Sequence, residues 1–101
     1  MCWMHEWAKA YRHLEYAITH IERAKLKMKF RAERFPNKGD WYLDAMTWND
    51  NIVKTLRSIQ KDLLAMIDEY GIKRGGRYNK TLQKLLTPPK MQPPEEWAEK
   101  N

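Results

Sequence analysis

The chain has 101 residues, of which 43% are hydrophobic and 32% charged, and its formal net charge is +6. This length allows one domain with a modest core, and the composition excludes a disordered chain. No apolar run reaches the length of a membrane span, and the single cysteine, Cys2, excludes an internal disulfide. Because the N-terminus also lacks a basic region followed by an apolar stretch, we expect a small cytoplasmic protein with no membrane partner.

The first predicted helix covers residues 3–35. Large apolar side chains recur every seven residues from Trp7, and a second series beginning at Trp3 follows the same period. Together they alternate spacings of three and four, which places them on one helical face. The stripe consists of Trp3, Trp7, Ala10, Leu14, Ala17, Ile21, Ala24, Met28 and Phe35, widened by Tyr11 and Ile18. Pro36 disfavours helical geometry at the residue before it, so the helix is expected to end there.

The second predicted helix covers residues 40–70 and follows a turn at Asn37-Lys38-Gly39. Asp40 is the expected N-cap and Gly71 the expected left-handed C-cap. Its apolar stripe consists of Trp41, Ala45, Trp48, Ile52, Leu56, Ile59, Leu63, Met66 and Tyr70. The short turn predicts that the two helices pack as an antiparallel hairpin with these stripes facing each other.

A short third helix is predicted over residues 80–87, where Pro88 and Pro89 end it. Its apolar face consists of Leu82, Leu85 and Leu86. Residues 88–101 are expected to form a proline-rich extended tail with a final helical turn. The predicted fold class is therefore all-α: a long antiparallel helical hairpin, a short third helix and a tail, with residues 1–87 forming one helical domain.

Positive charge is concentrated in two blocks. Residues 1–39 carry nine Lys and Arg against four Glu, and residues 72–92 carry six against none, whereas residues 40–71 carry three against six acids. Each basic block contains a candidate site for phosphate groups of a nucleic acid. The candidates are Lys25, Lys27, Lys29, Arg31 and Arg34 in the first helix, and Lys73, Arg74, Arg77, Tyr78 and Lys80 after the second.

Both basic groups also have a plainer interpretation. The bases of the first helix can form a solvated face that pairs with Asp44 and Asp50 of the second helix. The later group can be a solvated loop whose charges complement the C-terminus of the second helix. Since the first half of the chain has fewer than half as many acids as bases, some positive surface should remain unpaired.

No arrangement of side chains predicts an enzyme, a metal site or a cofactor. His13 and His20 lie two helical turns apart, too far to share one metal without a third element. Cys2 lies near the chain end, without an identifiable base. The Gly75-Gly76-Arg77 segment resembles a phosphate loop but lacks the Gly-Lys-Ser/Thr that binds a nucleotide.

Five tryptophans are many for this length. Trp7, Trp41 and Trp48 fall on the predicted stripes and are expected in the core. Trp3 and Trp97 lie near the chain ends and are candidate contacts for a partner protein, because aromatic side chains are enriched at interfaces. A two-helix hairpin also leaves apolar surface that a third helix, the tail, a second copy or another protein must cover.

One stretch of the second half resembles a known family. A helix ending in Asp68-Glu69-Tyr70-Gly71-Ile72, followed by Arg77, is similar to the end of some phage small terminase subunits, which bind DNA as oligomers. The resemblance covers about a third of the chain, and no helix-turn-helix pattern precedes it.

Two functions are compatible with these features. The first is a small, non-enzymatic nucleic-acid-binding accessory protein that contacts phosphates through its basic groups. The alternative is a protein-interaction module, an inhibitor or assembly adaptor of phage type, that docks on an acidic surface of a partner through Trp3 and Trp97. A third, less favoured interpretation is the subunit of a homo-oligomer.

Overall fold

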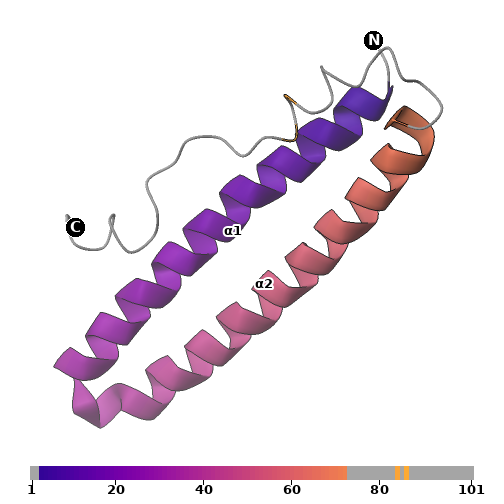
Figure 1. Ribbon diagram of the computed structural model, residues 1–101. Helices are drawn as coiled ribbons and strands as arrows, with labels where there is room; N and C mark the ends of the chain where they lie inside the picture. Colours follow the sequence, from indigo (N-terminus) through magenta and orange to yellow (C-terminus); the bar gives the residue numbers. More distant parts are fainter. Residues whose placement is uncertain (1–2, 73–83, 85, 87–101) are drawn as a thin grey trace. The chain divides into compact units, whose positions relative to one another are not determined.

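The computed structural model describes residues 3–72, 84 and 86 (Figure 1). Four elements follow each other along the chain: α1 (Trp3–Arg34), the 3-10 turn η1 (Pro36–Lys38), α2 (Gly39–Ile67) and the π-helical segment η2 (Asp68–Ile72). No described residue lies in a strand. The all-helical class is therefore confirmed for this part of the chain. Of the predicted third helix, only Lys84 and Leu86 are described, both as helical, and the predicted tail lies outside the described residues.

The helix ends agree with the predicted bounds to within a few residues. α1 ends just before Phe35, whose N–H still donates to the carbonyl of Arg31 at 2.8 Å, because Pro36 cannot continue the helix. α2 begins at Gly39, so Asp40 lies inside its first turn and the prediction that Asp40 is the N-cap is wrong. A carboxylate in that turn still complements the positive end of the helix dipole.

The far end of α2 also differs from the prediction. The helical chain continues beyond Ile67 as the wider η2 turn, which includes Gly71 and ends at Ile72. Gly71 therefore does not stop the helix at Tyr70, and the predicted role as a C-cap at that position is wrong. π-helical turns of this kind insert one extra residue per hydrogen-bonded ring and often occur near functional or strained segments.

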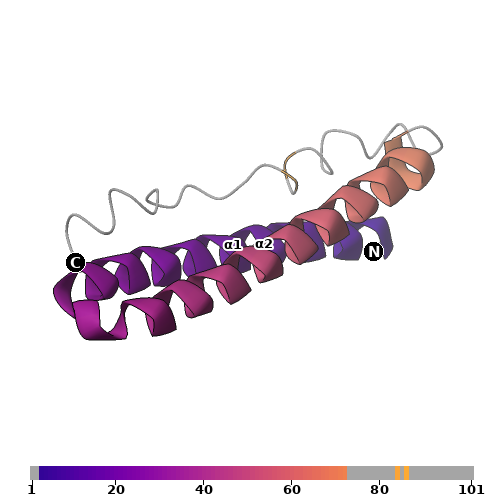
Figure 2. The same cartoon turned by 90° about the horizontal axis from the view of Figure 1, so that it is seen from below.

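The described residues form two compact units. The first contains residues 3–16, 56–72, 84 and 86, and the second contains residues 17–55. Each long helix contributes one segment to each unit. In the second unit, η1 connects the end of α1 to the start of α2 (Figure 2).

The first unit has a small apolar core. Met4, Ala8 and Ile67 are buried, and Trp7 and Leu86 pack against them. The ring of Trp7 also contacts Trp3, with centroids 4.7 Å apart, and Tyr70, at 6.3 Å. Residues from the start of α1 thus meet residues from the end of α2, so the two segments run in opposite directions within this unit.

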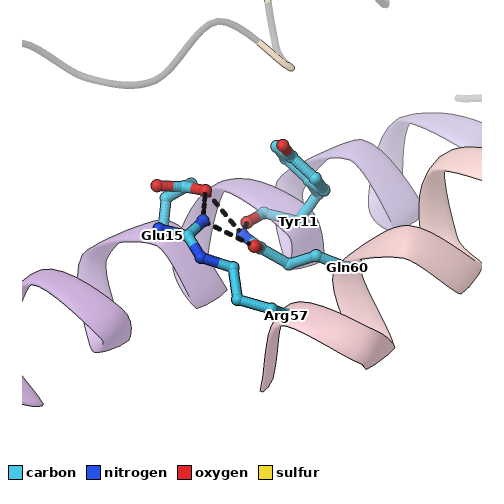
Figure 3. Close-up of polar contacts among 4 residues, drawn as sticks. All are labelled: Tyr11, Glu15, Arg57 and Gln60. Atoms are coloured by element: carbon cyan, nitrogen blue, oxygen red, sulfur yellow. Dashed lines mark hydrogen bonds and ion pairs between the residues drawn. The ribbon is translucent and has the colours of Figure 1, made fainter. Parts of the chain in front are cut away.

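The first unit also contains a polar cluster of Tyr11, Glu15, Arg57 and Gln60 (Figure 3). The side-chain amide of Gln60 donates to the carboxylate of Glu15 at 3.0 Å and to the backbone carbonyl of Tyr11 at 3.3 Å. The guanidinium of Arg57 donates to the same carboxylate and, at 3.0 Å, to the amide oxygen of Gln60. The NH₂ group of Gln60 must meet acceptors and its oxygen must meet a donor. Only one alignment of the two helix segments satisfies both requirements here, so the cluster fixes their register.

The second unit buries Ile18, Tyr42 and Asn49. Across its two segments, the ammonium of Lys25 lies 2.7 Å from the carboxylate of Asp50. Asn49 is an unusual core residue, because its amide nitrogen is buried and has no hydrogen-bond partner among the described residues.

The predicted stripes do not form the centre of either interface. On α2 the buried residues are Tyr42, Asn49, Gln60 and Ile67, and each lies one position after a stripe residue. On α1 the buried Met4 and Ala8 show the same offset from Trp3 and Trp7, whereas the buried Ile18 is one of the residues that widen the predicted stripe. One residue corresponds to about 100° around a helix, so the most buried positions lie beside the predicted stripes, while stripe residues such as Trp7 are partly buried against them. The expectation that Trp41 and Trp48 are core residues is wrong: they are 67% and 73% exposed.

Candidate nucleic-acid interface

The basic candidates of the first helix lie in the second unit, where they differ in their contacts. Lys25 is bound to Asp50, and the two side chains are 43% and 48% exposed. The predicted pairing of this helix with acids of the second helix is therefore confirmed for Lys25. This ammonium is largely neutralised and is the weakest of the five candidates as a phosphate contact.

Beyond Lys25, the end of α1 and the following turn carry a group of exposed cations that we call the α1-end cluster. No described carboxylate forms an ion pair with these side chains. The cluster consists of Lys29, Arg31, Arg34 and Lys38. Arg34 also lies over the ring of Phe35, with its guanidinium carbon 5.9 Å from the ring centroid.

In the described part of the chain, three hollows adjoin this cluster, and Trp41 lines two of them. The first of these two is a groove of about 320 Å³ between α1 and α2 of the second unit, lined by Ala24, Lys27, Met28, Arg31, Trp41, Tyr42 and Ala45. The second is a hollow of about 360 Å³ at η1, lined by Asn37, Lys38, Asp40, Trp41 and Tyr42. Both volumes lie at the lower end of the range of small-ligand sites.

Charge is distributed unequally between the two units. Residues 17–55 carry eight Lys and Arg against five Asp and Glu, whereas the described residues of the first unit carry five of each. Part of the basic charge at the end of α1 has a structural role, because Arg31 and Arg34 complement the negative end of that helix dipole. Glu33, Asp40 and Asp44 are exposed acids that reduce the local positive charge. The described residues of the second unit keep a net positive charge.

The remaining predicted sites are only partly described. Lys73, Arg74, Arg77, Tyr78 and Lys80 lie outside the described residues, as does Trp97. Trp3 is 55% exposed. Its ring contacts the ring of Trp7 and that of Tyr70, and the centroids of the Trp3 and Tyr70 rings lie 6.4 Å apart. Half of its surface is therefore open to a partner and half belongs to the aromatic cluster.

The main feature that sequence reasoning missed is the exposure of the tryptophans of α2. Trp41 and Trp48 fit an apolar stripe, and tryptophan is usually well buried, so both were assigned to the core. A signal was present in the sequence: α2 carries a second stripe one residue along, containing Tyr42, Met46, Val53 and Ile67. An apolar arc this wide cannot be covered by one neighbouring helix, so part of it must face outward.

Other classes of site find no support in the described part of the chain. No group of three or more His, Cys, Asp or Glu side chains is arranged to hold a metal ion there. None of its helices has the length and apolarity needed to cross a membrane. Comparisons with protein-family models, curated proteins and solved structures find no match to the chain.

Proposed function

We propose that this protein is a small, non-enzymatic nucleic-acid-binding accessory protein that contacts phosphates through the basic surface of its second unit. The observation that carries the proposal is the α1-end cluster: four exposed cations close together in sequence, none in an ion pair with a described carboxylate. Cations of this kind gain little from staying in water beside one another. They gain binding energy when they displace the counterions condensed on a polyanion.

The spacing of the cluster supports contacts with more than one phosphate. Lys29 and Arg31 lie on different sides of α1, and Arg34 follows almost one turn after Arg31. Lys38 extends the basic surface into η1. This arrangement reads no base sequence, so the binding is expected to be weakly sequence-specific.

Charge-removing variants test the proposal. Binding of a fluorescently labelled oligonucleotide is measured by anisotropy at low salt for the wild type and for the double variant Arg31→Gln/Arg34→Gln. The double variant is expected to bind at least tenfold more weakly, because each lost phosphate contact removes one released counterion. A matched control is Lys61→Gln, an equally exposed cation in the first unit, whose affinity should stay within twofold. Equal affinities of the double variant and the wild type would refute the proposal.

A second candidate function, a protein-interaction module, is favoured by a separate observation. Trp48 is 73% exposed, and Ile52, at 47%, lies about one turn after it on the same face of α2. Exposed apolar side chains grouped in this way are typical of surfaces that bind proteins. Under this alternative, Trp48→Ala abolishes capture of a protein partner from nuclease-treated lysate and leaves oligonucleotide affinity unchanged.

We also propose the full architecture on which either function would depend: one long antiparallel hairpin, covered by a third helix over residues 80–87 and followed by a proline-rich tail. Two contacts support it. Leu86, a residue of the predicted apolar face of that helix, packs against the core of Met4, Ala8 and Ile67. Within the first unit, Gln60 reaches Tyr11 in an antiparallel arrangement. Backbone carbon chemical shifts test the third helix: random-coil values over residues 80–87 would contradict it.

A further inference from the structure

Trp41 occupies a position that its packing does not explain. The side chain is 67% exposed, although burial of a tryptophan is strongly favourable. It forms part of the wall of both the groove beside α1 and the hollow at η1. The indole therefore offers surface to two adjoining spaces, each of which borders members of the α1-end cluster.

The indole ring contacts the ring of the next residue along the chain, Tyr42. The rings of Trp41 and Tyr42 lie 4.9 Å apart and at 80° to each other, an edge-on contact. Tyr42 is only 9% exposed, so the surrounding residues hold the ring that Trp41 contacts. Ala24 of α1 and Ala45, one turn after Trp41 on α2, also line the groove and are too short to cover the indole. Much of the indole surface is therefore open to contact by a flat aromatic group.

Charged and polar groups surround the ring in a pattern that suits a nucleotide. Lys27 and Arg31 line the groove, and Asn37 and Lys38 line the hollow. Asp40 is the one acid among the described residues that line these two spaces. A carboxylate repels a phosphate but accepts a hydrogen bond from an N–H group of a base.

We infer that the second unit binds single-stranded nucleic acid, with one base stacked on Trp41 and the adjacent phosphates held by Arg31 and Lys38. This inference rests on the function proposed above and specifies its ligand. Cations alone do not distinguish single strands from duplexes, because both present phosphates. A stacking platform does, because the faces of duplex bases are already covered by their neighbours, whereas single strands can place a base on an aromatic ring.

Substitutions at Trp41 test the inference. The probes are a labelled oligodeoxythymidine of about a dozen nucleotides, a length that covers the usual site size, and a duplex of equal length. Trp41→Ala is expected to weaken oligodeoxythymidine binding by about 5- to 150-fold, the loss of one base-stacking interaction. Trp41→Phe should retain most of the affinity. Neither substitution should change the dependence of affinity on salt, because no cation is removed.

The matched control is Trp48→Ala, an even more exposed tryptophan on the same helix that lines neither space. Its affinity for oligodeoxythymidine should stay within twofold of the wild type, and circular dichroism should show that every variant keeps its helices. The duplex should bind more weakly than the single strand and should not respond to Trp41→Ala.

Two results would overturn the inference, and they can be told apart. If Trp41→Ala binds oligodeoxythymidine like the wild type while Arg31→Gln binds more weakly, phosphates are contacted without stacking, and the proposed function survives. If the wild type binds neither probe at low salt, the proposed nucleic-acid-binding function is refuted, and the inferred stacking site is refuted with it.

Discussion

Gln60 provides the sharpest test of what holds the first unit together. The substitution Gln60→Met keeps an unbranched side chain of similar length and deletes the amide, which is only 3% exposed. It removes the bond to the Glu15 carboxylate, of a charged type worth about 1.5–3 kcal/mol, and the bond to the Tyr11 carbonyl, of a neutral type worth about 0.5–1.5 kcal/mol. Losing the hydrogen bond that Arg57 donates to Gln60 adds little to the destabilisation, because the guanidinium is half exposed and water can replace the lost acceptor.

The buried thioether offsets part of this loss by burying apolar surface, by about 1 kcal/mol. The net expectation is a destabilisation of about 1–3 kcal/mol. Urea unfolding followed by circular dichroism measures it: with a slope of about 1–2 kcal/mol per molar, the midpoint should fall by about 1 M and the slope should not change. Lys61→Met, at the exposed neighbouring position, is the control and should stay within about 0.5 kcal/mol. A Gln60→Met variant as stable as the wild type would show that the polar cluster contributes no net stability.

Two further predictions concern the second unit. Lys25→Ala should change the free energy of unfolding by less than about 1 kcal/mol, because its ion pair with Asp50 is nearly half exposed; a loss above about 2 kcal/mol in the same urea assay would contradict this. Asn49→Leu should raise the stability by about 1 kcal/mol, because it replaces a buried amide nitrogen that has no partner among the described residues. A lower melting temperature of that variant would show that Asn49 is satisfied by a group outside these residues.

The sequence predicted the lengths and approximate ends of the two helices well. The sequence predicts the first helix over residues 3–35, and α1 covers Trp3–Arg34. The end of this helix is predictable because Pro36 terminates it through local backbone geometry, without help from tertiary contacts. The expected end of α2 at Tyr70 was less accurate, since a glycine permits a left-handed cap but does not enforce one.

The interface between helix segments was predicted less well. The period of the hydrophobic residues shows how an apolar stripe runs along a helix. When the apolar arc is broad, however, the period does not show which part of the arc packs against the neighbouring helix. In the first unit, the polar bonds of Glu15, Arg57 and Gln60 lie at the interface, and no count of apolar residues could reveal them. Trp41 faces outward because its neighbour Tyr42 occupies the buried position. For this reason the candidates of the first helix are predicted from charge alone, and the only aromatic candidate for phosphate or base contact is Tyr78, not Trp41.

The dependence of oligonucleotide affinity on salt tests the central claim most directly. If Lys29, Arg31, Arg34 and Lys38 each contact one phosphate of a single strand, the logarithm of the association constant should fall linearly with the logarithm of the salt concentration, with a slope of about −3. Anisotropy titrations of oligodeoxythymidine at several salt concentrations give this slope. An affinity that stays the same across the salt series would contradict the claim that the basic surface of the second unit binds phosphates.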